Sequence, residues 1–90
     1  MDISYDPAKR AKVLADRGID FAQVGAVFAG PVAEIEDTRR DYGERRFITA
    51  GLLGDRVVVI VWTPRDGSRR IISMRFTHGR EEALWRQLLG

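Results

Sequence analysis

The chain has 90 residues, of which 44% are hydrophobic, as is typical of one small globular domain. It contains no cysteine, which excludes a disulfide framework, a thiolate zinc site and a thiol nucleophile. The longest aliphatic run has five residues, far fewer than a membrane span needs, and the first residues do not have the pattern of a signal peptide. We therefore expect a soluble cytoplasmic protein with a single domain over residues 1–90.

The charge is distributed unevenly along the chain, although the net charge is only +2. Residues 1–37 have a balance of −3, residues 38–90 have a balance of +5, and 13 of the 15 basic residues are arginines. The planar guanidinium binds two oxygens of a phosphate at once, which lysine cannot do. This pattern favours an anionic ligand for the C-terminal part, although a genomic bias towards arginine would give a similar count.

The first third of the chain has the pattern of two consecutive helices. Asp6 and Pro7 are typical of the cap and the first position of a helix, and Gly18 follows where a C-terminal cap belongs. A second helix is predicted from Asp20 to Phe28, where a capping-box pattern precedes an apolar stripe. Together these helices predict an N-terminal αα-hairpin.

The rest of the chain alternates with the period of β-strands and ends in a helix. Strands are predicted over residues 3–5, 32–37, 45–53, 56–63 and 71–76. A final helix is predicted around Glu81 to Leu89, because acidic residues occupy its first turn and apolar residues recur on one side. The predicted fold class is α+β, with an αα-hairpin, an antiparallel β-meander sheet and a C-terminal helix.

The two-residue turn at Gly54 and Asp55 sets a register in which Leu53 pairs with Arg56, and this register defines two sheet faces. One face is uniformly apolar and is predicted to be the core beneath the helices: Ile48, Ala50, Leu52, Val57, Val59, Val61, Ile72, Met74 and Phe76. The other is predicted to be open, with Phe47, Thr49, Gly51, Ile60, Trp62, Ile71, Ser73 and Arg75, and with Arg65, Arg69 and Arg70 at its rim. Such a face suits a stacked base and a bound phosphate, or it is simply the solvated side of the sheet.

Motifs for phosphate loops, dinucleotide binding and serine hydrolases do not occur, and no spacing of His, Asp or Glu indicates a metal site. His78 is the only histidine and is either a general acid–base group or an incidental surface residue. RNA cleavage remains possible because RNA carries its own nucleophile, the 2′-OH group. Arginines then stabilise the phosphate without a metal, and Glu44 or His78 moves the proton.

Five segments occur in an order that resembles the BrnT family of toxins from bacterial type II toxin–antitoxin modules. They are Tyr5–Lys9, Gly18–Phe21, Tyr42–Phe47, Thr63–Arg65 and Arg70–Arg75, the last reading RIISMR. The resemblance covers nearly the whole chain as one toxin domain and implies a RelE-like, microbial ribonuclease-like fold. It also implies cofactor-independent and metal-independent RNA cleavage that arrests translation. The implied partner is a BrnA-type ribbon-helix-helix antitoxin, through which the toxin reaches DNA only indirectly.

The resemblance also assigns site residues. Its motifs fall on Glu44, Arg46, Arg65, Arg70, Ser73 and Arg75. Arg75 and Arg65 are expected to clamp the scissile phosphate, with help from Arg46, and Glu44 is expected to accept the proton. Further RNA contacts are predicted at Arg70, Arg69, Arg45, Trp62, Phe47 and Lys9. The predicted register also places Ser73 and Arg75 on the open face. At the start of the strand predicted over residues 45–53 it places Arg45 on that face and Arg46 at the edge of the core side, and we keep both as candidates.

The chain departs from the family pattern at several positions. Val13 stands where the family usually has Asn, Asp16 and Arg17 stand in place of Lys-His, and Phe76 stands in place of a lysine. These changes remove cationic groups near a possible RNA path. A second hypothesis is therefore a catalytically degenerate toxin that binds an antitoxin and tunes repression of the operon. A third is a general RNA-binding module without cleavage.

Overall fold

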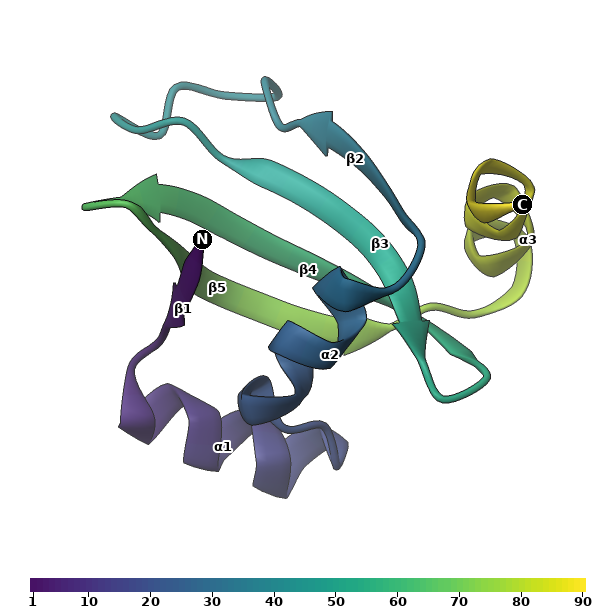
Figure 1. Cartoon of the computed structure of the whole chain (residues 1–90), viewed down its shortest axis with the longest axis horizontal. Coiled ribbons are helices and arrows are strands. Elements are labelled where there is room, and N and C mark those ends of the chain that lie inside the picture. Colours follow the sequence, from purple (N-terminus) through teal and green to yellow (C-terminus); the bar gives the residue numbers. More distant parts are fainter.

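The computed structural model describes residues 1–90, and its five strands form a single mixed sheet with helices on both faces (Figure 1). The elements in chain order are β1 (Asp2–Ser4), α1 (Pro7–Arg17), the 3₁₀ turn η1 (Phe21–Gln23), α2 (Val24–Ala29), β2 (Val32–Glu36), β3 (Phe47–Leu53), β4 (Arg56–Arg65), β5 (Ser68–Phe76) and α3 (Gly79–Leu89). The strand order in the sheet is β1-β5-β4-β3-β2. The α+β class is confirmed.

The sheet is mixed because β1 runs parallel to β5, whereas β2, β3, β4 and β5 are each antiparallel to the next. The expectation of a wholly antiparallel sheet was therefore wrong. β1 pairs only with Ser68–Arg70, at the beginning of β5. The outer edge of β5 beyond Arg70 therefore has no neighbouring strand.

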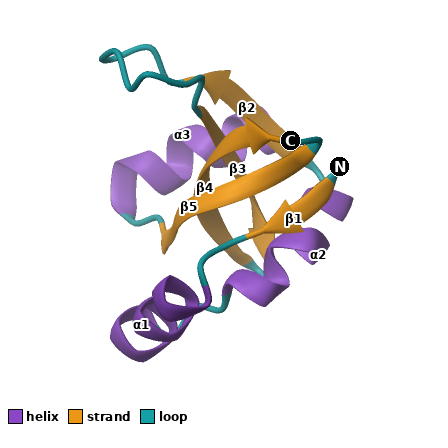
Figure 2. Ribbon diagram, turned by 90° about the vertical axis from the view of Figure 1, so that its left-hand side faces the viewer, coloured by secondary structure: helices purple, strands orange, loops and turns teal.

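The helical layer also differs from a simple αα-hairpin. α1 begins and ends as predicted: the Asp6 carboxylate accepts a hydrogen bond from the Ala8 N–H, and Gly18 adopts a left-handed conformation with φ 66°. The second helix, however, is divided into the turn η1 and the six-residue α2. α2 contacts β3 instead of lying along α1. Figure 2 shows α1 and α2 near each other and α3 well away from them, behind β4 and β5.

The register between β3 and β4 is as predicted, with Leu53 opposite Arg56 and Phe47 opposite Trp62. The assignment of the main core, however, was wrong, because the face expected to hold it buries only the smaller cluster of Ala50, Val57 and Val59. The main core lies between α1, η1 and α2 and the face that was expected to be open, and it includes Val13, Ile19, Phe21, Val24, Val27, Val58, Ile60, Trp62, Ile71 and Met74. We call this side of the sheet the α1/α2 face.

Polar groups on the α1/α2 face are buried because they satisfy each other. The Trp62 Nε1–H donates to Thr49 Oγ1 over 2.8 Å, and the Thr49 hydroxyl donates to the Glu34 carboxylate over 2.6 Å. Buried polar groups that are paired in this way do not need water. The Thr49 hydroxyl and the Trp62 indole therefore did not indicate that this face is exposed to solvent.

A β-bulge in β5 changes which of its residues share a face. Val61 pairs with Ser73 and Trp62 pairs with Ile71, so Ile72 has no partner. Met74 consequently joins the α1/α2 face instead of the face that holds Ile48, where the strict alternation had placed it. The same shift takes Phe76 to the α1/α2 face, where it packs against the main core.

The opposite side of the sheet, which we call the α3 face, is covered only in part. Ala50, Val57 and Val59 are buried there against Trp85 and Leu89 of α3. No residue of α3 is itself fully buried. None of the helices has both the length and the apolar character that crossing a membrane requires.

Candidate functional site

The α3 face collects the residues that the family resemblance singled out. Arg70 pairs with Thr63, Ser73 with Val61, and Arg75 with Val59. These positions alternate along their strands with the buried residues of the α1/α2 face. Their side chains therefore belong to the α3 face. The prediction that Ser73 and Arg75 share a face with Trp62 was wrong, because the bulge at Ile72 shifts the residues that follow it. Arg65, which pairs with Ser68, also lies on the α3 face.

The family motif names Arg46, whereas the predicted register favoured Arg45. The structure resolves this difference, because the motif residues lie on the α3 face and Arg46 lies there with them. The Asp37 N–H donates to the Arg46 carbonyl over 2.8 Å, so the pairing of the strands continues to this residue. Arg46 therefore follows the parity of Ile48 on the α3 face. Arg45 lies on the other side, where its guanidinium is 5.0 Å from the Phe47 ring and pairs with Glu36 over 2.9 Å.

Three of the predicted residues form one contact group, which we call the Glu44 cluster. The Glu44 carboxylate accepts from Arg46 Nε and from Arg65 Nη2, each over 3.3 Å. The Arg46 guanidinium also lies 4.1 Å from the centre of the Tyr42 ring. One carboxylate thus orients two guanidinium groups and leaves a net positive charge at this end of the face.

The loop that carries the Glu44 cluster is anchored by Asp37, the residue that directly follows β2. The Asp37 side chain is only 2% exposed and accepts hydrogen bonds from the Arg39 guanidinium and from the Tyr42 hydroxyl. The Arg39 guanidinium holds the pKa of the Asp37 carboxyl far below its usual range. The carboxylate therefore stays ionised and fixes the path of the loop.

Arg75 has a different partner at the other end of the face. Its guanidinium makes two hydrogen bonds to the Glu81 carboxylate in the first turn of α3, over 2.7 and 2.8 Å. The hydrogen bonds that Arg75 donates to Glu81 raise the pKa of Arg75 and lower the pKa of Glu81. The Arg75 side chain remains 45% exposed, so a phosphate can still reach it.

The structure does not bring Arg65 and Arg75 together. Arg65 pairs with Ser68 at the start of β5, and Arg75 lies seven positions after Ser68. One of these positions is the bulged Ile72, so the separation equals the six positions from Arg65 to Val59 along β4, or roughly 20 Å at about 3.3 Å per residue. Glu44 stays with Arg65, whereas Ser73 lies two positions before Arg75 on the same face. The predicted clamp of Arg65 and Arg75 on one phosphate therefore does not match this geometry.

Several predicted RNA contacts lie on the α1/α2 face or in the core. Trp62 is only 4% exposed, and its ring stacks on Phe47 at 4.9 Å, so it offers no free surface to a base. The Arg69 guanidinium lies 4.1 Å from the Phe28 ring on the α1/α2 face. Lys9 is exposed on α1, which packs against that same face. Of the predicted RNA contacts, Arg70 lies on the α3 face with Arg46 and Arg75.

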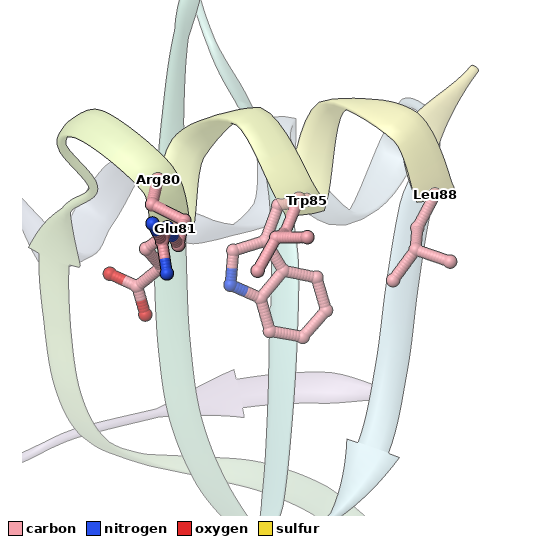
Figure 3. Close-up of a pocket in the computed structure, with 5 residues that line it drawn as sticks. Arg80, Glu81, Trp85 and Leu88 are labelled. Carbon is pink, nitrogen blue, oxygen red and sulfur yellow. The ribbon is translucent and has the colours of Figure 1, made fainter.

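Two hollows were not predicted from the sequence. A pocket of about 400 Å³ lies beside β5 and is lined by Arg17, Arg75, Phe76 and His78. A groove of about 450 Å³ runs along α3, lined by Arg80, Glu81, Leu84, Trp85 and Leu88 (Figure 3). Nowhere do three or more His, Asp or Glu side chains gather closely enough to hold a metal ion. Arg17 and His78 come from distant segments, and no local signal could have joined them.

Comparison with known proteins identifies the family. No curated protein matches the chain. The family model described as "Ribonuclease toxin, BrnT, of type II toxin-antitoxin system" matches residues 5–81, which is more than half of the chain. The match includes the Glu44 cluster and both partners of the Arg75–Glu81 ion pair. The chain therefore belongs to the BrnT family of ribonuclease toxins of type II toxin–antitoxin systems.

Proposed function

We propose that this protein cleaves RNA without a metal ion, through attack of the 2′-OH group on the adjacent phosphate. The observation that carries the proposal is the register of the sheet. It gathers five polar residues of the family motifs on the α3 face, which no helix covers completely: Arg46, Arg65, Arg70, Ser73 and Arg75. We also propose that the chain has the RelE-like ribonuclease fold that the family resemblance implies.

The chemistry requires little from the protein beyond positive charge and position. The 2′-oxygen forms a bond to phosphorus while the bond to the 5′-oxygen breaks, which leaves a 2′,3′-cyclic phosphate and a 5′-hydroxyl end. Negative charge increases on the phosphate oxygens during this step, and a guanidinium stabilises it. Arg75 contacts the scissile phosphate, with the Ser73 hydroxyl beside it. The other three arginines lie too far along the strands to contact the same phosphate. They bind the phosphates on either side of it: Arg46, Arg65 and Arg70.

The experiment is an incubation of the purified chain with end-labelled RNA in EDTA, followed by analysis of the fragment ends. We expect cyclic phosphate or 3′-phosphate ends, and a loss of about 10²- to 10³-fold in rate for Arg75→Ala, as when one transition-state donor is removed. Arg46→Ala should weaken cleavage, whereas Arg45→Ala, its neighbour on the opposite face, should have little effect. Full activity of a folded Arg75→Ala variant, or cleavage only when metal is added, would contradict the proposal.

The family implies an antitoxin partner and an RNA target. We propose that the partner is a BrnA-like ribbon-helix-helix protein, through which the toxin influences operator DNA, and that both act in the cytoplasm, where translation occurs.

The partner would bury the groove on α3, where Leu84 is 56% and Leu88 is 67% exposed. Leu88→Asp should abolish the complex in a pull-down while RNA cleavage persists. Retention of the complex would place the interface elsewhere.

A second candidate function, that of a toxin without catalytic activity, is favoured by the contact between Arg75 and Glu81. The two hydrogen bonds between Arg75 and Glu81 occupy the arginine that should meet the phosphate. A degenerate toxin that only binds its antitoxin and tunes repression would retain this arrangement. In that case the folded chain leaves RNA intact, overexpression is harmless, and Arg75→Ala still supports repression of the operon.

A further inference from the structure

The pocket beside β5, which we call the edge pocket, is built from three separate parts of the chain. Arg17 comes from the end of α1, Arg75 and Phe76 come from β5, and His78 is the residue that precedes α3. The pocket exists because β1 covers only the beginning of β5. Along the free edge, the Arg17 guanidinium donates to the Met74 carbonyl over 3.1 Å.

The charges in the edge pocket are only partly neutralised. Arg17 forms no ion pair with a carboxylate, and its side chain contacts the Met74 carbonyl through a single hydrogen bond. The imidazole of His78 caps no backbone group and makes no hydrogen bond within the chain. Glu81 is the one carboxylate that contacts a residue of this pocket, and both of its oxygens are directed at Arg75.

This arrangement matches a phosphate ester better than a neutral ligand. Two arginines line this pocket, and a guanidinium group offers planar donors to phosphate oxygens. The beginning of the eleven-residue helix α3 adds the partial positive charge of its N-terminus. Phe76 contributes an apolar wall next to these donors. A pocket of about 400 Å³ has room for a phosphate with its attached sugar.

We propose that the edge pocket holds the scissile phosphate of the RNA and that His78 accepts the proton of the attacking 2′-OH group. This inference rests on the proposed function and deepens it. Glu44 is bound to Arg46 and Arg65 at the other end of the face, and Glu81 is committed to Arg75. His78 carries the imidazole of this pocket, and an imidazole is the side chain that most often acts as a general base.

In this step, the imidazole takes the proton while the 2′-oxygen forms its bond to phosphorus. The bond from phosphorus to the 5′-oxygen breaks with its electron pair, and the 5′-oxygen takes a proton from water. The hydroxide that remains is neutralised by the proton on His78, which restores the free imidazole. Arg75 and Arg17 stabilise the charge on the phosphate oxygens, and neither gains nor loses a proton.

The first arm of the test measures phosphate binding by NMR, with inorganic phosphate as the probe. Because His78 is the only histidine, its ring proton gives a resonance that cannot be confused with another residue. We expect saturable shifts of this resonance and of the Phe76 amide. Arg17→Gln should weaken binding roughly tenfold, as expected for loss of a charged hydrogen bond. Lys12→Gln, which removes an exposed charge from the same helix, should leave binding unchanged.

The second arm measures RNA cleavage by the same proteins. His78→Gln should reduce kcat by about 10²-fold or more with little change in KM, as expected for loss of a general base, and it should still bind phosphate. Arg17→Gln should mainly raise KM. Cleavage by His78→Gln at the wild-type rate would overturn the role of His78, and phosphate shifts unaffected by Arg17→Gln would overturn the pocket.

The two arms separate this inference from the proposed function. If the wild-type protein leaves RNA intact, the proposed function and the proton transfer at His78 fail together. Phosphate shifts that depend on Arg17 would in that case still support the edge pocket as a phosphate site. If the wild type cleaves RNA but phosphate does not shift His78, the proposed function stands and the edge pocket is excluded.

Discussion

Asp37 connects the sheet to the loop that carries Glu44 and Arg46. It directly follows β2, its backbone N–H pairs with the Arg46 carbonyl, and its carboxylate accepts from Arg39 and Tyr42. Both ends of the loop are thereby tied to one buried, ionised group. Asp37 therefore helps to position the Glu44 cluster, together with Thr63, whose hydroxyl donates to the Arg45 carbonyl over 2.7 Å.

The ionisation of Asp37 leads to a prediction for the pH dependence of stability. Because hydrogen bonds from Arg39 lower the pKa of Asp37 in the folded chain, its contribution to stability is fully present above the ordinary pKa of aspartate, about 4. The contribution is lost as the pH falls below that value. In urea unfolding, Asp37→Asn should be less stable than wild type from pH 7 to pH 5, and the difference should shrink below about pH 4.

The matched control for this prediction is Asp41→Asn in the same loop. The Asp41 carboxylate accepts one hydrogen bond, from the Gly43 N–H, and Asn can accept the same bond. This variant should therefore unfold like wild type at every pH. A difference between Asp37→Asn and wild type that stays constant down to pH 2 would show that Asp37 acts by packing and not by charge.

At the scale of elements, the contact between α2 and β3 determines which face of the sheet becomes the core. A Cβ atom at Gly51 of β3 would lie 2.5 Å from Val27 Cγ1 of α2, so the helix docks directly on the strand backbone. This close approach is possible only with glycine at that position. It places the short α2 over β3 and buries the neighbouring residues of the α1/α2 face.

Gly51→Ala should therefore overpack this contact. We expect a loss of about 1–3 kcal/mol in the free energy of unfolding, which lowers Tm by roughly 4–8 °C for each kcal/mol. The control is Gly25→Ala within α2, where a Cβ atom meets nothing within 4 Å and where alanine favours the helix. That variant should be neutral or slightly stabilised. An unchanged Tm for Gly51→Ala would mean that α2 is not tightly docked.

At the scale of the whole molecule, the two faces of the sheet have different roles. The α1/α2 face supplies the main core, and the partly covered α3 face presents arginines from β4, from β5 and from the loop before β3. The longest extent of the molecule is 32 Å, so the roughly 20 Å between Arg65 and Arg75 spans more than half of it. Single-stranded RNA lying across this face would contact several phosphates in succession.

This arrangement predicts the salt dependence of RNA binding. For single strands, each phosphate contact contributes a slope of about −0.7 to the plot of log K against log salt concentration. With a 2′-deoxy oligonucleotide that cannot be cleaved, Arg46→Ala and Arg65→Ala should each make the slope less negative by about 0.7. Arg45→Ala, on the opposite face, should leave it unchanged. Equal effects of Arg45→Ala and Arg46→Ala would show that the RNA does not select the α3 face.

The sequence by itself determined the local elements and the identity of the family. Asp6 and Gly18 mark the ends of α1, the turn at Gly54 and Asp55 sets the pairing of β3 with β4, and the family motifs indicate a BrnT toxin. These features depend on neighbouring residues in the chain or on a short loop. Their physical causes, capping hydrogen bonds and turn geometry, are therefore visible in the sequence.

Only the tertiary structure decided which face is buried and what surrounds Arg75. The bulge at Ile72 exchanges the faces of the residues that follow it, and Trp62 is buried because Thr49 satisfies its indole. The edge pocket brings Arg17 and His78 to Arg75 from distant parts of the chain. Burial and convergence of this kind depend on where helices dock and where a strand edge remains unpaired, and neither property is encoded in the local alternation of residues.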